Sequence, residues 1–135
     1  PRIRARGVTQ LPRPLRCPPI WVGGNSVRAM RRAVDLGQGW SPFPNPVVAS
    51  AAVKTPAITN LDELGERLSQ ARDHAALVGR SEPLDISFAP FRLEDRPEPY
   101  ASLGVTWLTL QVESSATRSE WIERVADLGR SLVLG

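Results

Sequence analysis

The chain has very few of the residues that form disulfides and metal centres. Its 135 residues include one cysteine, Cys17, and one histidine, His74. A single cysteine excludes an internal disulfide, and no His/Cys/Asp cluster has the spacing of metal ligands. His74 has no positioned partner in the pattern, so we expect it at the surface and not in catalysis. The sequence predicts no metal site and offers no Ser/His/Asp or Cys/His nucleophile set.

Long apolar runs are also missing. No segment approaches the roughly 20 apolar residues that a membrane-spanning helix requires. No charged segment followed by an apolar stretch opens the sequence, so we expect no signal peptide. The length suits one domain with a modest core, and the low cysteine content favours a cytoplasmic protein. Because the sequence opens on Pro1 and not on Met, we expect the natural N-terminus to lie elsewhere.

Acidic residues are absent from the first quarter of the chain. Residues 1–34 contain eight arginines and no acid, whereas the remainder has nine basic and fourteen acidic residues. Such asymmetry can indicate a nucleic-acid arm. These arginines alternate with prolines and apolar residues and lack interleaved aromatic residues. We therefore expect no nucleic-acid binding, and favour a solvated face or one that pairs with the acids of a partner.

The most informative stretch runs from Pro18 to Ser26, Pro-Pro-Ile-Trp-Val-Gly-Gly-Asn-Ser. A short strand, Ile20–Val22, leads into two glycines, and Asn25 and Ser26 are both suitable N-caps for a helix over Val27–Leu36. Glycines let the backbone approach a ligand, and the first amides of a helix carry its positive end. This unit favours phosphate binding. A tight strand-to-helix turn that binds nothing fits the pattern equally well.

Apolar residues recur at strand or helix spacing through the rest of the chain. The expected strands are residues 20–22, 39–41, 84–89 and 105–112, and the expected helices are 27–36, 61–78 and one that begins after Thr117. Residues 1–17 are expected to form an extended lead-in, residues 44–58 a loop, and residues 91–99 a surface loop or broken helix. Alternating strands and helices indicate a parallel sheet with crossover helices, so we expect an α/β fold with about four strands and three helices.

Local signals predict how these elements end and what they bury. Two residue pairs have the spacing of a capping box, Asn60–Glu63 and Thr117–Glu120. Gly37 and Gly79 are placed to end helices in left-handed turns. Strand 84–89 alternates as if one face were buried, whereas strand 105–112 is apolar on both faces. Trp107 and Trp121 are expected to anchor the core between sheet and helix.

The stretch from Pro18 to Ser26, and the Arg-Ala-Met-Arg-Arg-Ala-Val-Asp-Leu-Gly-Gln-Gly-Trp-Ser-Pro-Phe that begins at Arg28, resemble the C-terminal half of the bacterial luciferase-like monooxygenases. The branch that uses the deazaflavin coenzyme F420 looks closest. It tends to show a strand ending in Gly-Gly, a helix with paired arginines, and Gly-Asp-Gly-Trp. Gln38 stands here where the family often has Asp. The resemblance covers essentially the whole chain, but its specific motifs lie within residues 11–43.

This resemblance implies an eight-stranded TIM barrel, of which residues 1–135 form a single C-terminal half-barrel fragment, a partial (β/α) barrel. It implies a parent oxidoreductase or monooxygenase that uses coenzyme F420 or FMN on a small organic substrate. The resemblance implies that Gly23 and Gly24 bind the cofactor phosphate, with Asn25 and Ser26 as supporting donors. Three further residues are expected either to flank the cofactor or to pack the barrel: Gly39, Trp40 and Ser41. No catalytic residue is assigned.

A half-barrel would leave two strand edges without hydrogen-bonded neighbours and would expose the inner face of the sheet. We expect it to be completed by its own N-terminal half or by another copy in a homo-oligomer, and we expect the chain alone to be inactive. The alternative function is a non-catalytic, truncated half-barrel that acts only through self-assembly or a partner chain.

Overall fold

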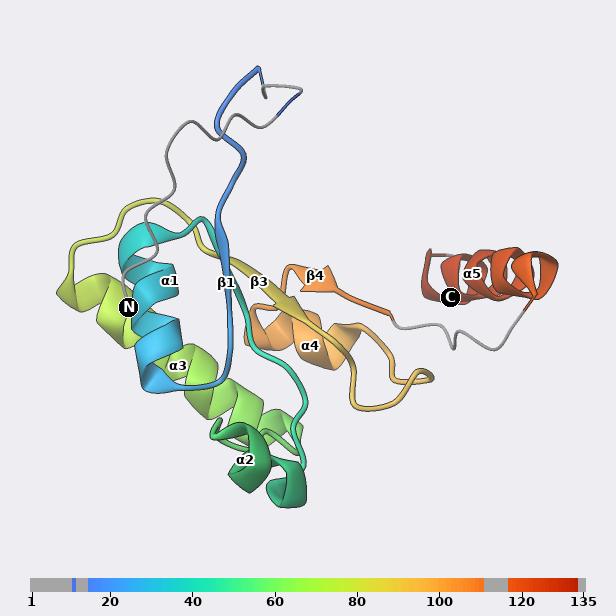
Figure 1. Cartoon of the computed structure of the whole chain (residues 1–135), viewed down its shortest axis with the longest axis horizontal. Coiled ribbons are helices and arrows are strands. Elements are labelled where there is room, and N and C mark those ends of the chain that lie inside the picture. Colours follow the sequence, from blue (N-terminus) through green and yellow to red (C-terminus); the bar gives the residue numbers. More distant parts are fainter. Residues whose placement is uncertain (1–10, 12–14, 111–116, 134–135) are drawn as a thin grey trace.

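A computed structural model describes residues 11, 15–110 and 117–133. Most of the expected lead-in, residues 1–10 and 12–14, therefore lies outside the described residues. Four strands form one sheet in the order β1-β2-β3-β4, namely β1 (Trp21–Gly23), β2 (Gly39–Ser41), β3 (Asp85–Phe88) and β4 (Trp107–Leu108). Every neighbouring pair is parallel (Figure 1). The expected α/β class with four parallel strands is confirmed.

The described residues form five helices where three were expected. They are α1 (Val27–Leu36), α2 (Val47–Val53), α3 (Leu61–Leu77), α4 (Glu98–Leu103) and α5 (Arg118–Val133). The prediction that residues 44–58 form a loop is wrong over α2. Helix α4 begins at the end of residues 91–99, for which the sequence left a surface loop or a broken helix open. Both helices begin at prolines, Pro46 and Pro97, which occupy the N-cap positions. A proline at a helix start loses no intrahelical hydrogen bond, so these prolines begin helices instead of preventing them.

The helix ends follow the expected signals with one exception. The Asn60 side chain accepts a hydrogen bond from the Glu63 amide at 2.9 Å. The Glu63 carboxylate in turn accepts from the Thr59 amide at 2.7 Å, and this bond lowers the pKa of Glu63. Gly79 is left-handed as expected, but Gly37 is extended, with φ −100° and ψ 168°. Gly37 cannot turn back because the chain must pass directly from α1 into β2.

The core lies between the sheet and the layer formed by α1 and α3. Its largest fully buried side chains include Trp40, Ile58, Leu64, Phe88 and Tyr100. Three of the four residues of β3 are buried, so the expectation of one buried face is wrong for this strand. Strand β3 lies between β2 and β4, and Ser87 on its second face is covered by the residue that follows β4, since the Thr109 hydroxyl lies 2.9 Å from that of Ser87.

The C-terminal part is less buried than the sequence indicates. Strand β4 has two residues, and Trp107 remains 57% exposed on the sheet face, where its ring meets that of Trp21 edge to face at 6.0 Å. Residues 111–116 lie outside the description, so the end of the expected strand 105–112 cannot be compared. Helix α5 stands apart from the sheet (Figure 1), and Trp121 is 46% exposed. Neither tryptophan is therefore the core anchor that the sequence predicts.

The second expected capping box is present at the start of α5, where the Glu120 carboxylate accepts a hydrogen bond from the Thr117 amide at 2.7 Å.

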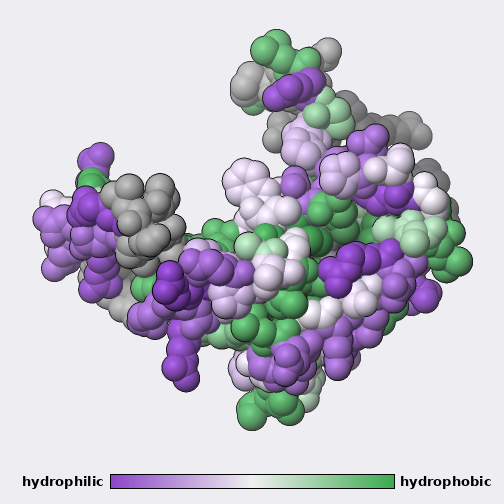
Figure 2. All heavy atoms as spheres, turned by 180° about the vertical axis from the view of Figure 1, so that it is seen from behind, coloured by the Kyte–Doolittle hydropathy of each residue, from purple (hydrophilic) through white to green (hydrophobic). Residues whose placement is uncertain are grey.

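Apolar surface is exposed across the middle of the molecule, as Figure 2 shows in green. None of the helices in the described part of the chain has the length and apolar character needed to cross a membrane.

Candidate functional site

The turn from β1 to α1 lies at the carboxyl end of the sheet strands. Ser26 is the N-cap of α1, and its hydroxyl accepts a hydrogen bond from the Ala29 amide at 3.2 Å. Among the described residues, the amides of Val27 and Arg28 have no acceptor. The first turn of α1 contains no acidic residue. Two N–H groups and the positive end of the helix dipole therefore face outward at this edge.

Gly24, the second glycine of the turn, is required by the fold. Its φ of +116° lies in a region that side chains rarely adopt, and an added Cβ would come within 3.3 Å of the Ala29 Cβ. Its amide donates to the Ser41 carbonyl at 3.2 Å, and its carbonyl accepts from the Trp40 indole at 2.8 Å. The backbone of Gly24 is thus already bonded within the protein and offers no free amide to a ligand.

The Asn25 side chain is also fully used inside the protein. It is 1% exposed, and its amide nitrogen donates to the carbonyls of Phe43 and Pro56, each at 2.9 Å. Its side-chain oxygen accepts from the Phe43 amide at 2.9 Å. Asn25 ties the turn to two distant loop segments and has no remaining side-chain donor directed to solvent. The expected role of Asn25 as a supporting donor therefore has no free side-chain group to perform it, whereas the Ser26 hydroxyl accepts from the Ala29 amide and keeps its own O–H to donate.

Gly23, the first glycine, is different because nothing in the fold requires it. It is exposed, and an added Cβ would meet only the Ser41 carbonyl oxygen, at an ordinary contact distance of 3.9 Å. The Ile20 carbonyl and the Gly24 amide both bond toward β2. Since backbone groups alternate along a strand, the Gly23 amide points to the free side of β1. The missing side chain leaves space that only the Ser41 carbonyl oxygen borders within 4 Å.

Gly39 and Trp40 have packing roles in this structure. An added Cβ on Gly39 would lie 2.7 Å from the ring of Trp21, which rests on this glycine. Trp40 is completely buried in the core. Ser41 contributes its carbonyl to the bond with Gly24. Of the two roles that the sequence left open for these residues, the contacts favour packing.

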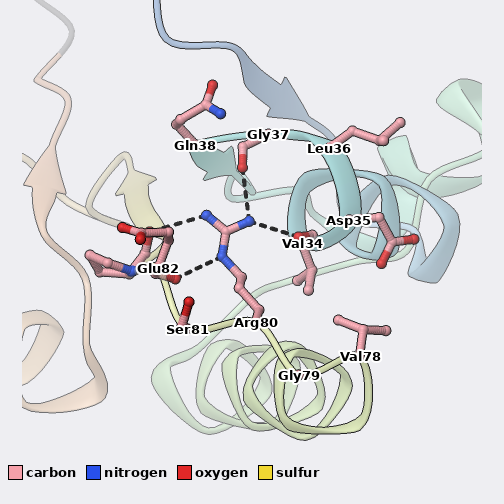
Figure 3. A pocket seen from close by; sticks show the side chains of 11 residues that line it. Val34, Asp35, Leu36, Gly37, Gln38, Val78, Gly79, Arg80, Ser81 and Glu82 are labelled. Atoms are coloured by element: carbon pink, nitrogen blue, oxygen red, sulfur yellow. Dashed lines mark hydrogen bonds between the residues drawn. The ribbon is translucent and has the colours of Figure 1, made fainter.

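Arg80, which the sequence analysis did not single out, organises the opposite end of the sheet. It lies in a surface hollow of about 580 Å³ formed by the end of α1 and the loop before β3 (Figure 3). Its guanidinium donates to four backbone carbonyls, those of Val34 (2.7 Å), Gly37 (2.9 Å), Glu82 (2.8 Å) and Pro83 (3.1 Å). Arg80 is therefore a structural clamp within this hollow, because its guanidinium caps carbonyls at the end of α1 and joins them to the loop before β3.

Two other polar contacts join elements of the fold. His74 on α3 lies 2.8 Å from the Asp35 carboxylate on α1, so it links the two helices and is only partly at the surface. The Tyr100 hydroxyl donates to Asp95 at 2.6 Å and accepts from the Phe91 amide at 3.0 Å. Burial, with a smaller contribution from Asp95, raises the pKa of Tyr100 to about 12. This network fixes the loop between β3 and α4.

Within the described ranges, no three His, Cys, Asp or Glu side chains are grouped as metal ligands would be. No buried side-chain nitrogen or oxygen in the same part of the chain lacks a hydrogen-bond partner. Comparison of the chain with protein-family models, with curated proteins and with solved structures finds no match.

Proposed function

We propose that this chain is the C-terminal half of a luciferase-like (β/α) barrel and that it presents the start of α1 to the phosphate of a flavin or deazaflavin cofactor. The strand order supports the barrel. A sequential parallel order, β1-β2-β3-β4, is the one that a barrel uses, whereas doubly wound sheets reverse direction at a switch point. The parent would be an oxidoreductase or monooxygenase acting on a small organic substrate.

The observation that carries the cofactor proposal is Gly23. The fold does not require glycine there, and this glycine ends β1 a few residues before the two amides, Val27 and Arg28, that have no acceptor in the described chain. We infer that a side chain at the end of β1 would intrude on a ligand held at this end of the sheet. An anion placed there would complete the first turn of α1, as phosphates do at other helix N-termini.

The charges around α1 favour an anion in the same place. Arg28, Arg31 and Arg32 are exposed, and no acid within the described residues pairs with them. Acidic residues are the usual stabilisers of a helix N-terminus, and this helix has none in its first turn. The ring of a bound cofactor would supply the hydride transfer or oxygen activation, while the role of this chain would be to hold the phosphate end.

A fluorescence titration with FMN, the deazaflavin and pyrophosphate tests the proposal. We expect saturable binding by the intact chain and a loss of at least tenfold in affinity in Gly23→Val, whose Cβ meets only the Ser41 carbonyl oxygen, at 3.9 Å, and whose side chain would intrude on the bound phosphate. Gly129→Val is the matched control, because an added Cβ on Gly129 meets nothing within 4 Å and lies on α5. Absence of binding by the intact chain, or equal binding by both variants, would refute the cofactor role.

A second candidate is a non-catalytic half-barrel that acts only through assembly. Two observations favour it: Trp21 and Trp107 are exposed on the sheet face by 37% and 57%, and the Gly24 amide and Asn25 side chain are already bonded internally. The face would be completed by the N-terminal half or by another copy. Sedimentation velocity that shows a defined assembly, together with no cofactor binding, would select this candidate over the first.

A further inference from the structure

An apolar groove runs beside α3 on the helix-covered side of the sheet. Its volume is about 240 Å³, and its apolar lining comes from α3, from the region of β3, and from the junction of α4 with β4: Leu68, Ala71, Ala75, Leu84, Ile86 and Leu103. Three charged side chains also line it, those of Arg72, Arg80 and Glu82. The Arg72 guanidinium at its rim is bonded to the Leu103 carbonyl at 3.1 Å.

Helix α5 has an apolar stripe that no other helix or strand of the described residues covers. Its 16 residues correspond to a helix of about 24 Å. Trp121, Ile122 and Val125 are exposed by 46%, 53% and 40%, although they share one helix face. Among the described residues, α5 contacts no other helix or strand, and Figure 1 shows it standing away from the sheet. An amphipathic helix of this kind is normally stabilised by burying its apolar face.

We propose that α5 folds back onto its own chain and places the stripe of Trp121, Ile122 and Val125 in the groove beside α3. The connection allows this. Thr109 to Thr117 is eight residue steps, which span up to about 28 Å when extended. A helix that follows a strand of a parallel sheet also returns over the face that the earlier crossover helices occupy, and α3 marks that face here.

The occupant is this chain's own α5 and not that of a second copy. A short tether holds the stripe near the groove at an effective concentration in the millimolar range, far above that of free chains in solution. Docking would leave the charged side of α5 facing water, because Glu123 and Asp127 lie on the face opposite the stripe. Helix α5 is thus a strap that covers the groove when docked and exposes it when released.

Disulfide trapping in the full chain tests this docking. In a Cys17→Ser background, Ala75→Cys on the groove is combined with Val125→Cys on the stripe, or with Glu123→Cys on the opposite face as the matched control. We expect an intrachain disulfide to form at least tenfold faster with Val125→Cys, at a rate independent of protein concentration. Equal rates for the two pairs, or a disulfide formed only between chains, would overturn the proposal.

Hydrogen exchange on chains without engineered cysteines gives an independent test. We expect Trp121→Asp to increase exchange at least fivefold in the α3 segment 68–75 and Glu123→Gln to leave it unchanged. Circular dichroism of both variants checks that the sheet and α3 remain folded. Unchanged exchange in a folded Trp121→Asp variant would contradict docking.

Discussion

Asn25→Asp is expected to destabilise the protein strongly, although it changes one NH₂ group to an oxygen. Asn25 is 1% exposed and donates two hydrogen bonds, to the carbonyls of Phe43 and Pro56. An aspartate cannot donate these bonds when ionised, and it would place a negative charge against two carbonyl oxygens in a buried site. The bond accepted from the Phe43 amide is the only one that would survive.

The expected loss follows from these contacts. The Phe43 carbonyl would lose its donor, which costs about 1–3 kcal/mol. The Pro56 carbonyl would keep only a 3.5 Å bond from the Asn45 side chain, and the buried charge adds a further penalty. A domain of this size is stable by about 5–15 kcal/mol in total. We therefore expect a loss of at least about 3 kcal/mol, which would move the urea midpoint down by more than about 1 M for ordinary values of the denaturant dependence.

The same substitution at Asn60 is the control. Asn60 caps α3 through a side-chain oxygen that aspartate retains, and Asp and Asn are about equally good N-caps. Urea unfolding followed by circular dichroism should show Asn60→Asp within about 0.5 kcal/mol of the parent chain. A loss below about 1 kcal/mol for Asn25→Asp would refute the conclusion that this side chain holds the turn to its two loops.

Three further perturbations probe the structure. Gly39→Ala places a Cβ 2.7 Å from the Trp21 ring and should displace it, costing about 1–3 kcal/mol and changing the near-UV spectrum, whereas Gly23→Ala should do neither. Arg80→Lys keeps the charge but cannot donate to four carbonyls at once, so the melting temperature should fall by several degrees; no change would exclude a clamp. Tyr100 is the only tyrosine, and its pKa is raised to about 12 in the folded protein. The unfolded chain therefore ionises first as the pH rises. The free energy of unfolding should be unchanged below pH 10 and should decrease between pH 10 and 12, by up to about 3 kcal/mol. Absorbance titration at alkaline pH reads this phenol directly, and a midpoint near 10 in the folded protein would contradict the assignment.

Much of the fold could be predicted because the relevant signals are local. The bounds of α1 match the expectation, since Ser26 is a strong N-cap and the buried Met30, Ala33 and Val34 repeat at helical spacing. The parallel sheet follows from the alternation of strands and helices. Helix α2 was missed because residues 44–58 were interpreted as a loop, and the start of α4 falls in residues 91–99, which were left open as a surface loop or a broken helix. The sequence does not distinguish a proline before a helix, such as Pro46 or Pro97, from one that ends a strand.

The candidate site could be located from the sequence, but the separate roles of its residues could not be predicted. The glycine pair marks the turn, yet only the structure separates a glycine that the backbone requires, Gly24, from one that it does not, Gly23. Asn25 has the local character of an N-cap, but its partners lie 18 and 31 residues away. The clamp made by Arg80 joins carbonyls up to 46 residues away, and no local pattern signals it.

The parallel pairing of all four strands restricts what can extend this sheet. A neighbour added beside β1 or beside β4 in the same pattern must run in the same direction as the present strands. A tight hairpin reverses the chain and cannot supply such a neighbour, whereas a crossover of a dozen or more residues, or a separate molecule, can. Growth that keeps the parallel pattern therefore comes only from segments that arrive from a distance, whereas a hairpin could add only an antiparallel edge strand.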